Sequence, residues 1–288
     1  MKYSQFTTRF APSPTGHLHL GHAYAALYAA RAAKAESGRL LLRVEDIDQT
    51  RCRTAFEAAI FEDLAWLGLS WEKPVRRQSE HFGEYTAALE RLREKELIYR
   101  CFKTRKEIVD EIARAPHLRV DGPDGPAYIG APLAALEERS LIAEGAPFAW
   151  RLSIERVREY LGARYQRLSF CEEMQSGPIE RQATPAIFGD AVLARKDSGT
   201  SYHLASVHDD ALQGVTHVIR GTDLRAAAHL HCLLQALFDY PTPVYRHHRL
   251  ITGDDGRRLA KRDSAATLKS MRDSNISPQE VRSQLGFD

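Results

Sequence analysis

Apolar and polar residues at the start of the chain are grouped in a way that predicts a strand, a helix and a second strand. The apolar-flanked run Thr7–Phe10 predicts the first strand, and an Ala-rich stretch from about Leu18 to Lys34 predicts the helix. Ser37-Gly38 is a helix stop signal, and the compact apolar run Arg39–Val44 after it predicts a buried strand. This order predicts a βαβ unit with parallel strands and a right-handed crossover.

Apolar residues at helical or alternating spacing continue after this unit. Predicted helices lie at 56–67, 82–92, 104–114 and 133–144, and predicted strands at 148–154 and 215–219. Thr222 or Asp223 is expected to cap a helix that runs to Phe238. Ser277–Glu280 is a capping box with Pro at the first helical position, so it predicts the start of a last, short helix.

The character of the chain changes near Tyr99, where short helices and a loop rich in Pro and Gly replace the long apolar stripes. Regular apolar patterning returns at Ala191. We therefore expect an α/β fold whose parallel sheet is interrupted by a smaller inserted α+β domain. The expected segments are 1–100 for the first half of the sheet domain, 101–185 for the insertion, 186–245 for the second half and 246–288 for a loop and C-terminal helical segment.

Composition and charge narrow the class without identifying a function. The chain has 288 residues, 43% of them hydrophobic, and a formal net charge of +2, so any RNA site must be a local patch. No apolar run approaches the ~18 residues of a membrane span, and the N-terminus does not resemble a secretory signal. Cys52, Cys101, Cys171 and Cys232 are scattered without a pairing pattern, which favours reduced thiols and a cytoplasmic location.

The stretch Arg9–His22 joins the first predicted strand to the first helix and carries the strongest chemical signal. Two prolines and a glycine force a tight turn before the helix N-terminus, where backbone N–H groups and the helix dipole attract anions. His19 and His22 are three positions apart and share one face of the first turn. Gly21 between them leaves room for a ligand against the backbone. A helix start with two hydrogen-bonded histidines is the alternative.

His19-Leu20-Gly21-His22 resembles the HIGH motif of class I aminoacyl-tRNA synthetases, and the string from Arg9 to Gly16, with Glu45 downstream, resembles their glutamyl branch. The resemblance implies the Rossmann-like parallel sheet of that class. It also implies that both histidines hold the phosphates of ATP, bound with Mg²⁺, and stabilise the transition state for adenylate formation. The ATP-binding residues that it implies are Pro12, Thr15, Gly16, His19, Gly21, His22, Arg258 and Lys261.

A second stretch, Arg257–Arg262 after the Gly-flanked segment Gly253–Gly256, resembles the KMSKS loop of the same class. Lys261 stands at the position of the catalytic lysine. A mobile cation is needed where pyrophosphate leaves, because that charge develops only in the transition state. Arg258, Ala260 and Arg262 depart from the consensus, so we expect a functional loop with altered closure. A solvated basic turn is the alternative.

The resemblance also assigns residues to the amino acid. Arg9, Tyr202 and Arg220 match the positions that hold the side-chain carboxylate of glutamate, and Glu45 matches the position that meets the α-ammonium. Guanidinium groups pair with carboxylates bidentately, which disfavours glutamine. A structural ion pair between Arg9 and Glu45 is the alternative. The glutamate-binding residues that the resemblance implies are Arg9, Ala11, Ser13, Glu45, Tyr202 and Arg220.

Other polar residues are given structural roles. Asp209, Asp210 and Asp223 recur at family positions, where helix capping is favoured over a magnesium or ribose role. His203 and His208 are interpreted as local substitutions.

A zinc site built from C-x-C and a later Y-x-x-x-C is common in short relatives of the glutamyl-queuosine type. Cys101 and Tyr128 remain here, but Lys103 and Pro132 replace the other two ligands. Zinc needs about four ligands, so we expect no structural zinc and no other bound metal besides the Mg²⁺ of ATP.

The resemblance extends from Thr8 to about Arg262, and few residues follow, whereas glutamyl-tRNA synthetases continue with an anticodon-binding portion. It therefore favours the glutamyl-Q tRNA(Asp) synthetase family, which activates L-glutamate without tRNA and transfers it to queuosine in the anticodon loop of tRNA(Asp). A truncated glutamyl-tRNA synthetase acting on a 3′ adenosine and a catalytically silent glutamate or nucleotide sensor are the alternatives. We expect a monomer without a membrane partner. Candidate contacts to RNA phosphates, or else a solvated surface, are Arg246, Arg249, Arg257, Arg258, Arg262, Lys269 and Arg272.

Overall fold

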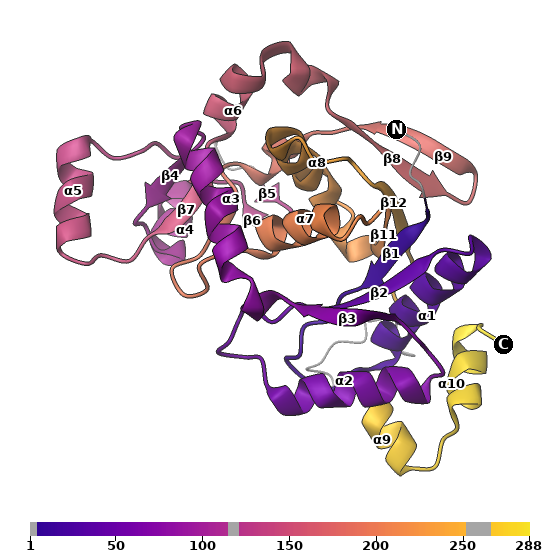
Figure 1. Cartoon of the computed structure of the whole chain (residues 1–288). Coiled ribbons are helices and arrows are strands. Elements are labelled where there is room, and N and C mark those ends of the chain that lie inside the picture. The colour runs from indigo at the N-terminus through magenta and orange to yellow at the C-terminus, as the bar shows by residue number, and fades with distance from the viewer. Residues whose placement is uncertain (1–4, 115–120, 252–265) are drawn as a thin grey trace.

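The computed structural model describes residues 5–114, 121–251 and 266–288. Its first half confirms the predicted strand–helix–strand unit and extends it by a second helix and a third strand (Figure 1). The elements are β1 (Thr7–Phe10), α1 (Leu20–Ala35), β2 (Arg39–Val44), α2 (Thr54–Trp66) and β3 (Glu72–Arg77). β2 pairs in parallel with β1 on one side and with β3 on the other.

The second half adds strands on the other side of β1. β11 (His217–Gly221) and β12 (Val244–His248) are parallel, and β12 pairs in parallel with β8 (Ser169–Met174), which forms an antiparallel hairpin with β9 (Gly177–Gln182). Just before β11, Thr216 donates its backbone N–H to the carbonyl of Thr7 over 2.9 Å, which joins the two halves. The carboxyl ends of β1 and β11 therefore open at the same edge of the sheet, where ligands bind in open α/β folds.

A second, antiparallel sheet of three strands lies beside this one, in the order β10 (Val192–Ala194), β7 (Ala149–Leu152), β4 (Ile98–Cys101). β5 (Asp121–Gly122) and β6 (Gly125–Pro126) form a short hairpin. The remaining helices are α3 (Phe82–Glu94), α4 (Arg105–Arg114), α5 (Ala135–Ala143), α6 (Ile154–Leu161), α7 (Tyr202–Leu212), α8 (Ala227–Phe238), α9 (Leu268–Asp273) and α10 (Pro278–Leu285).

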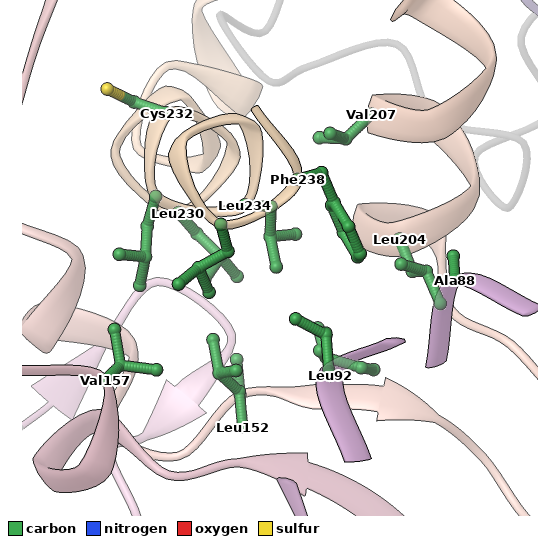
Figure 2. Packing of buried hydrophobic residues seen from close by; sticks show 14 of the residues in the cluster. Ala88, Leu92, Leu152, Val157, Leu204, Val207, Leu230, Cys232, Leu234 and Phe238 are labelled. Carbon is green, nitrogen blue, oxygen red and sulfur yellow. The ribbon is translucent and has the colours of Figure 1, made fainter. Parts of the chain in front are cut away.

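The larger hydrophobic core lies between α8 and the elements around the antiparallel sheet. Leu230, Leu234 and Phe238 point from α8 toward Leu92 and Leu152 (Figure 2). A second core joins α1 and α2 to the two C-terminal helices, through the buried residues Leu18, Ile60, Leu64, Leu268 and Val281. The segment that follows residues 252–265 is thus packed against the helix that starts at the His-x-Gly-His stretch.

The structure also corrects one prediction and adds elements that the pattern did not predict. Neither Thr222 nor Asp223 caps α8, because these residues form a 3₁₀ turn and Ala226 precedes the helix without a side-chain cap. The polar strands β3, which is half exposed, and β9, which is largely exposed, were not predicted. The domain boundaries at 100, 185 and 245 stay a prediction. Among the described helices, none has the length and apolar character needed to cross a membrane.

Candidate active site

A cavity of about 190 Å³ opens at the carboxyl ends of β1 and β11, beside the start of α1. It brings together residues that lie far apart in the sequence. Of the predicted site residues, its lining includes Arg9, Ala11, His19, Gly21, His22, Glu45, Tyr202 and Arg220. Residues from motifs that are distant in the sequence thus line one cavity in the folded chain.

Other predicted residues lie elsewhere. Ser13 and Thr15 line a second cavity of about 310 Å³, which shares Glu45 and Tyr202 with the first. Pro12 accepts the backbone N–H of Glu45 over 3.0 Å and so fixes the turn against the end of β2, while Gly16 belongs to the lining of neither cavity. Arg258 and Lys261 lie outside the described residues.

The two signature histidines build the start of α1. His19 is the N-cap, and its Nδ1 accepts the backbone N–H of Gly21 over 3.1 Å. The Nδ1 of His22 accepts the backbone N–H of His19 over 3.2 Å, which completes a capping box made of histidines. In a neutral imidazole whose Nδ1 accepts, the ring proton lies on Nε2. Each ring therefore presents Nε2 as a donor.

Gly21 allows this arrangement. A Cβ there would lie 3.0 Å from Cε1 of His19, so the capping ring would have to shift to make room for a side chain. The two rings are stacked at an angle, with centroids 3.9 Å apart. Their compact pairing at a helix N-terminus combines ring donors with the backbone N–H groups and dipole that attract anions.

Arg9 is held by a buried carboxylate that sequence reasoning assigned differently. Its Nε donates to Asp210 over 2.9 Å, and its Nη1 donates to the carbonyl of Ile219 over 3.4 Å. Arg43, which is fully buried in β2, bonds to Asp210 over 2.7 Å and to Glu45 over 3.1 Å. The expected alternative, a direct Arg9–Glu45 pair, is therefore replaced by pairs through Asp210 and Arg43.

The two adjacent aspartates of α7 are not helix caps, which corrects the prediction. Both lie inside the helix and are buried, and Asp209 accepts hydrogen bonds from Arg76 over 2.8 Å and from the Gln78 amide over 2.8 Å. Two signals in the sequence point to such buried pairs. One is a charged Arg43 inside the apolar run of β2, and the other is a pair of acids inside an apolar helix.

Charge is unevenly compensated around this cluster. Burial alone would raise the pKa of Asp210, but Arg9 and Arg43 lower it below its ordinary value. The pKa of Glu45 is raised, because burial outweighs the attraction of Arg43 and Arg9. Glu45 is thus a cavity-lining carboxylate whose ionised form would gain from a further positive charge.

Arg220 is the opposite case, a cation that would gain from a further negative charge. Its Nη1 donates to the Tyr202 hydroxyl over 3.2 Å, and its guanidinium lies 5.2 Å from the ring centroid of Tyr245. Its Nη2 is buried and has no hydrogen-bond partner among the described residues. Burial and the charge of Arg220 lower the pKa of His247 to about 4, so this neighbour is neutral and supplies no counter-charge.

Three of the basic residues considered for RNA phosphates are paired within the chain. Arg246 pairs with Glu173, Lys269 with Asp273, and Arg272 with Asp63. Arg249 lines the first cavity and lies 5.1 Å from the ring centroid of Tyr24. Arg257, Arg258 and Arg262 lie outside the described residues.

The residues around Cys101 and Tyr128, where the resemblance places a zinc site in relatives, make other contacts. Cys101 and Tyr128 are buried, and the Lys103 ammonium pairs with Glu111 and lies 5.7 Å from the Tyr128 ring centroid. No group of three or more His, Cys, Asp or Glu in the described part of the chain could hold a metal ion. The absence of zinc stays a prediction. All four cysteines are free thiols.

A parallel sheet with a His-x-Gly-His helix start beside an arginine-lined cavity defines the catalytic domain of a class I aminoacyl-tRNA synthetase. The family described as tRNA synthetases class I (E and Q), catalytic domain, matches residues 5–286. The chain is 44% identical to a Rhodobacter capsulatus protein named glutamyl-Q tRNA(Asp) synthetase, over 97% of this chain and 99% of that one. The chain therefore belongs to the glutamyl-Q tRNA(Asp) synthetase family within this class.

Longer relatives share the same domain. The chain is 35% identical to a Jannaschia glutamate–tRNA ligase, over 96% of this chain and 59% of that one. A solved glutamate–tRNA ligase of Elizabethkingia meningosepticum, in complex with its amino acid, superposes with a TM-score of 0.71 at 28% identity. That match covers 90% of this chain and 52% of the ligase, so this chain spans about half the length of the solved relative.

Proposed function

We propose that this protein activates L-glutamate with ATP, without tRNA, and transfers the glutamyl group to queuosine in the anticodon loop of tRNA(Asp). One observation carries the choice of amino acid. Arg220 is buried at the cavity, its Nη2 has no hydrogen-bond partner among the described residues, and the side chains that its guanidinium contacts there, Tyr202, His231 and His247, are not carboxylates. A carboxylate in the cavity would supply the missing acceptor and counter-charge.

The two charged ends of glutamate match the charges of Arg220 and Glu45 in the cavity. Its side-chain carboxylate would pair with Arg220 and accept from Tyr202, while Arg9, tethered to Asp210, adds positive charge from behind. Its α-ammonium would lie toward Glu45, a carboxylate whose pKa is raised because burial outweighs the attraction of Arg43 and Arg9. Ala11 and Ser13 flank this end. A neutral glutamine side chain would leave the charge of Arg220 uncompensated, which supports selection of glutamate.

ATP would bind along the start of α1. The Nε2 donors of His19 and His22 and the helix N-terminus would hold its phosphates, with Gly21 allowing close approach and Pro12, Thr15 and Gly16 shaping the turn. Arg258 and Lys261 are proposed to approach the same phosphates. Mg²⁺ bound to the phosphates would neutralise charge on the departing pyrophosphate.

The reaction needs no side-chain nucleophile. A glutamate α-carboxylate oxygen attacks the α-phosphorus of ATP, a new O–P bond forms, and the bond to pyrophosphate breaks. A queuosine hydroxyl then attacks the activated carbonyl, forming an ester and releasing AMP and a proton. The chain's residues bind, orient and stabilise charge. The acceptor follows from the names of the relatives, and we also propose that the protein acts in the cytoplasm as a monomer.

Two assays test the proposal in order. Glutamate-dependent exchange between ATP and pyrophosphate, measured without tRNA, should occur in the wild type, and its absence at high enzyme concentration would favour a silent glutamate or nucleotide sensor. Glutamylation should then require tRNA(Asp) that contains queuosine. Charging of tRNA(Glu) instead would support a glutamyl-tRNA synthetase acting on the 3′ adenosine.

A variant pair tests the residue that carries the proposal. Arg220→Lys keeps the charge but removes the planar fork, so the KM for glutamate should rise by about 10- to 100-fold. Arg246→Lys on the neighbouring strand β12 is the matched control, because Arg246 pairs with Glu173 away from the cavity and should leave this KM unchanged.

A further inference from the structure

Behind Arg220, polar side chains form a row that runs from the first cavity to the protein surface. Nη1 of Arg220 lies 3.4 Å from Nδ1 of His231 on α8. Nε2 of His231 lies 3.1 Å from Nδ1 of His203 on α7. Nε2 of His203 lies 2.9 Å from Oδ2 of Asp124, in the turn between β5 and β6. Both histidines are buried, and Asp124 lies at the exposed end.

The chemistry of these groups allows the hydrogen bonds along the row to run in only one direction, from Arg220 to Asp124. A guanidinium can only donate, so Nδ1 of His231 must accept. Burial, together with the charge of Arg220, lowers the pKa of His231 well below its ordinary value, so this neutral ring carries its proton on Nε2. It therefore donates to His203, whose Nδ1 accepts and whose Nε2 donates to Asp124. The hydrogen bond from His203 lowers the pKa of Asp124, which keeps it ionised as the final acceptor.

The row reaches Arg220 from elements outside its own strand, and one of them, α7, also holds Arg220 directly, because Nη1 donates to the hydroxyl of Tyr202 at the start of that helix. Arg220 belongs to β11, while its three successive partners come from α8, α7 and the β5–β6 turn. The far end also faces ligand space, because Asp124 and His203 line the second cavity together with Tyr202. The orientation of the guanidinium thus depends on Tyr202, which lines the first cavity, and also on the three residues of the row, which do not line it.

We propose that His231, His203 and Asp124 are positioning residues for glutamate. They hold one guanidinium nitrogen of Arg220, leave Nη2 for the substrate carboxylate, and so set affinity and selectivity for a dicarboxylic amino acid. This inference rests on the proposed function of the first cavity. It predicts that a substitution at the exposed Asp124, remote from glutamate, changes glutamate recognition without changing ATP recognition.

The test is exchange between ATP and pyrophosphate, with glutamate and ATP varied separately. Asp124→Ala should raise the KM for glutamate about 2- to 5-fold, and His203→Phe about 5- to 10-fold, each corresponding to about one lost hydrogen bond. His203→Gln, which can accept and donate at the same two ends, should restore a KM near that of the wild type. The kcat and the KM for ATP should stay within about 2-fold of the wild type.

Asp121→Ala, in the same hairpin but outside the row, is the matched control and should leave all parameters unchanged. A wild-type KM for glutamate in both Asp124→Ala and His203→Phe would overturn the inference, and so would parallel losses in kcat and in both KM values. If His203→Phe failed to fold, Asp124→Ala would still decide. If the wild type showed no exchange, the proposed function would fail separately. An equal calorimetric Kd for glutamate in wild type and Asp124→Ala would then overturn the positioning role proposed for the row.

Discussion

Arg9 in β1 donates to Asp210 in α7 over 2.9 Å, and both side chains are buried. The contact joins residues that lie 201 positions apart and ties the first strand to the helix behind the cavity. Arg43 shares the same carboxylate, so one aspartate pairs with two buried guanidinium groups. Asp210 thus sets the charge that Arg9 contributes to the candidate active site.

Asp210→Asn should destabilise the fold by about 3 kcal/mol, because it leaves two buried cations with one fewer counter-charge. The pKa of Asp210 is lowered in the folded state, so its contribution is present above its unfolded pKa of about 4 and is lost as the pH falls through the folded value. The difference between wild type and variant should therefore shrink in acid. Urea denaturation at several pH values measures it. Asp273→Asn, which removes an exposed pair with Lys269, should change stability little, and an equal loss in both variants would contradict this account.

His19→Asn separates the two roles of the first signature histidine. Asparagine is a good N-cap and can still accept from the backbone of Gly21, so the melting temperature should change little. It lacks the Nε2 donor, so the kcat of exchange should fall by about 10²- to 10³-fold. Thermal melting and exchange kinetics measure the two effects. In His19→Leu, which loses both groups, the melting temperature and the kcat should both decrease. A wild-type kcat in His19→Asn would exclude the proposed phosphate contact.

Lys261→Ala tests the second motif, which lies outside the described residues. A cation that acts on departing pyrophosphate contributes in the transition state and not to amino-acid binding. The variant should therefore lose exchange activity while keeping the calorimetric Kd for glutamate. Loss of both to the same degree would contradict the role given to Lys261.

Metal analysis of the purified protein tests the zinc prediction. The Lys103 ammonium beside Glu111 and Tyr128 occupies the neighbourhood with a cation and disfavours a second one. Less than one tenth of an equivalent of zinc per chain is expected, roughly the level of adventitious binding. One zinc per chain that resists dialysis against a chelator would show that other ligands complete the site.

Local patterning predicted much of the fold, and it failed where pairing depends on distant residues. The strand limits of Thr7–Phe10 and Arg39–Val44 follow from apolar runs and turn signals, which are local. Strand β9 is polar and largely exposed, and it is a part of the sheet because it pairs with β8, which pairs with β12. Periodicity carries no information about such a partner.

In the candidate site, too, local motifs were predicted and contacts between distant residues were not. Motif resemblance predicted eight of the residues that line the first cavity, since each motif is a short string, but it did not predict others such as Ile219 and His248. It did not predict that Arg43 and Asp210, 167 positions apart, would meet behind that cavity. It also treated His203 as a local substitution, because its partners on α8 and on the β5–β6 turn are close only in the folded chain. Residues that position a site through other residues do not occur at a characteristic spacing in the sequence, so no short motif predicts them.

Asp63 in α2 provides a test of how the C-terminal helices are anchored. It is fully buried, and its Oδ1 lies 3.1 Å from Nη2 of Arg272 in α9. Burial raises its pKa to about 6, although Arg272 opposes this rise. A carboxyl whose pKa is raised on folding stabilises the protein below its unfolded pKa, and this contribution is lost as the pH rises toward the folded value. The unfolding free energy of the wild type should therefore fall by roughly 1–3 kcal/mol between about pH 4 and pH 7 from this group.

Asp63→Asn should remove that pH dependence, because the amide stays neutral throughout, and it should be more stable than the wild type at pH 8. Chemical denaturation across this pH range measures both effects. Glu62→Gln is the matched control, since Glu62 also contacts Arg272 over 3.2 Å but is largely exposed. Its charge adds to the raised pKa of Asp63, so this variant should keep the direction of the wild-type pH dependence with a smaller fall. If Asp63→Asn were instead less stable than the wild type at pH 8, the ion pair with Arg272 would outweigh the cost of burying its charge, and α9 would be held by electrostatic attraction rather than by apolar packing of Leu268 and Met271.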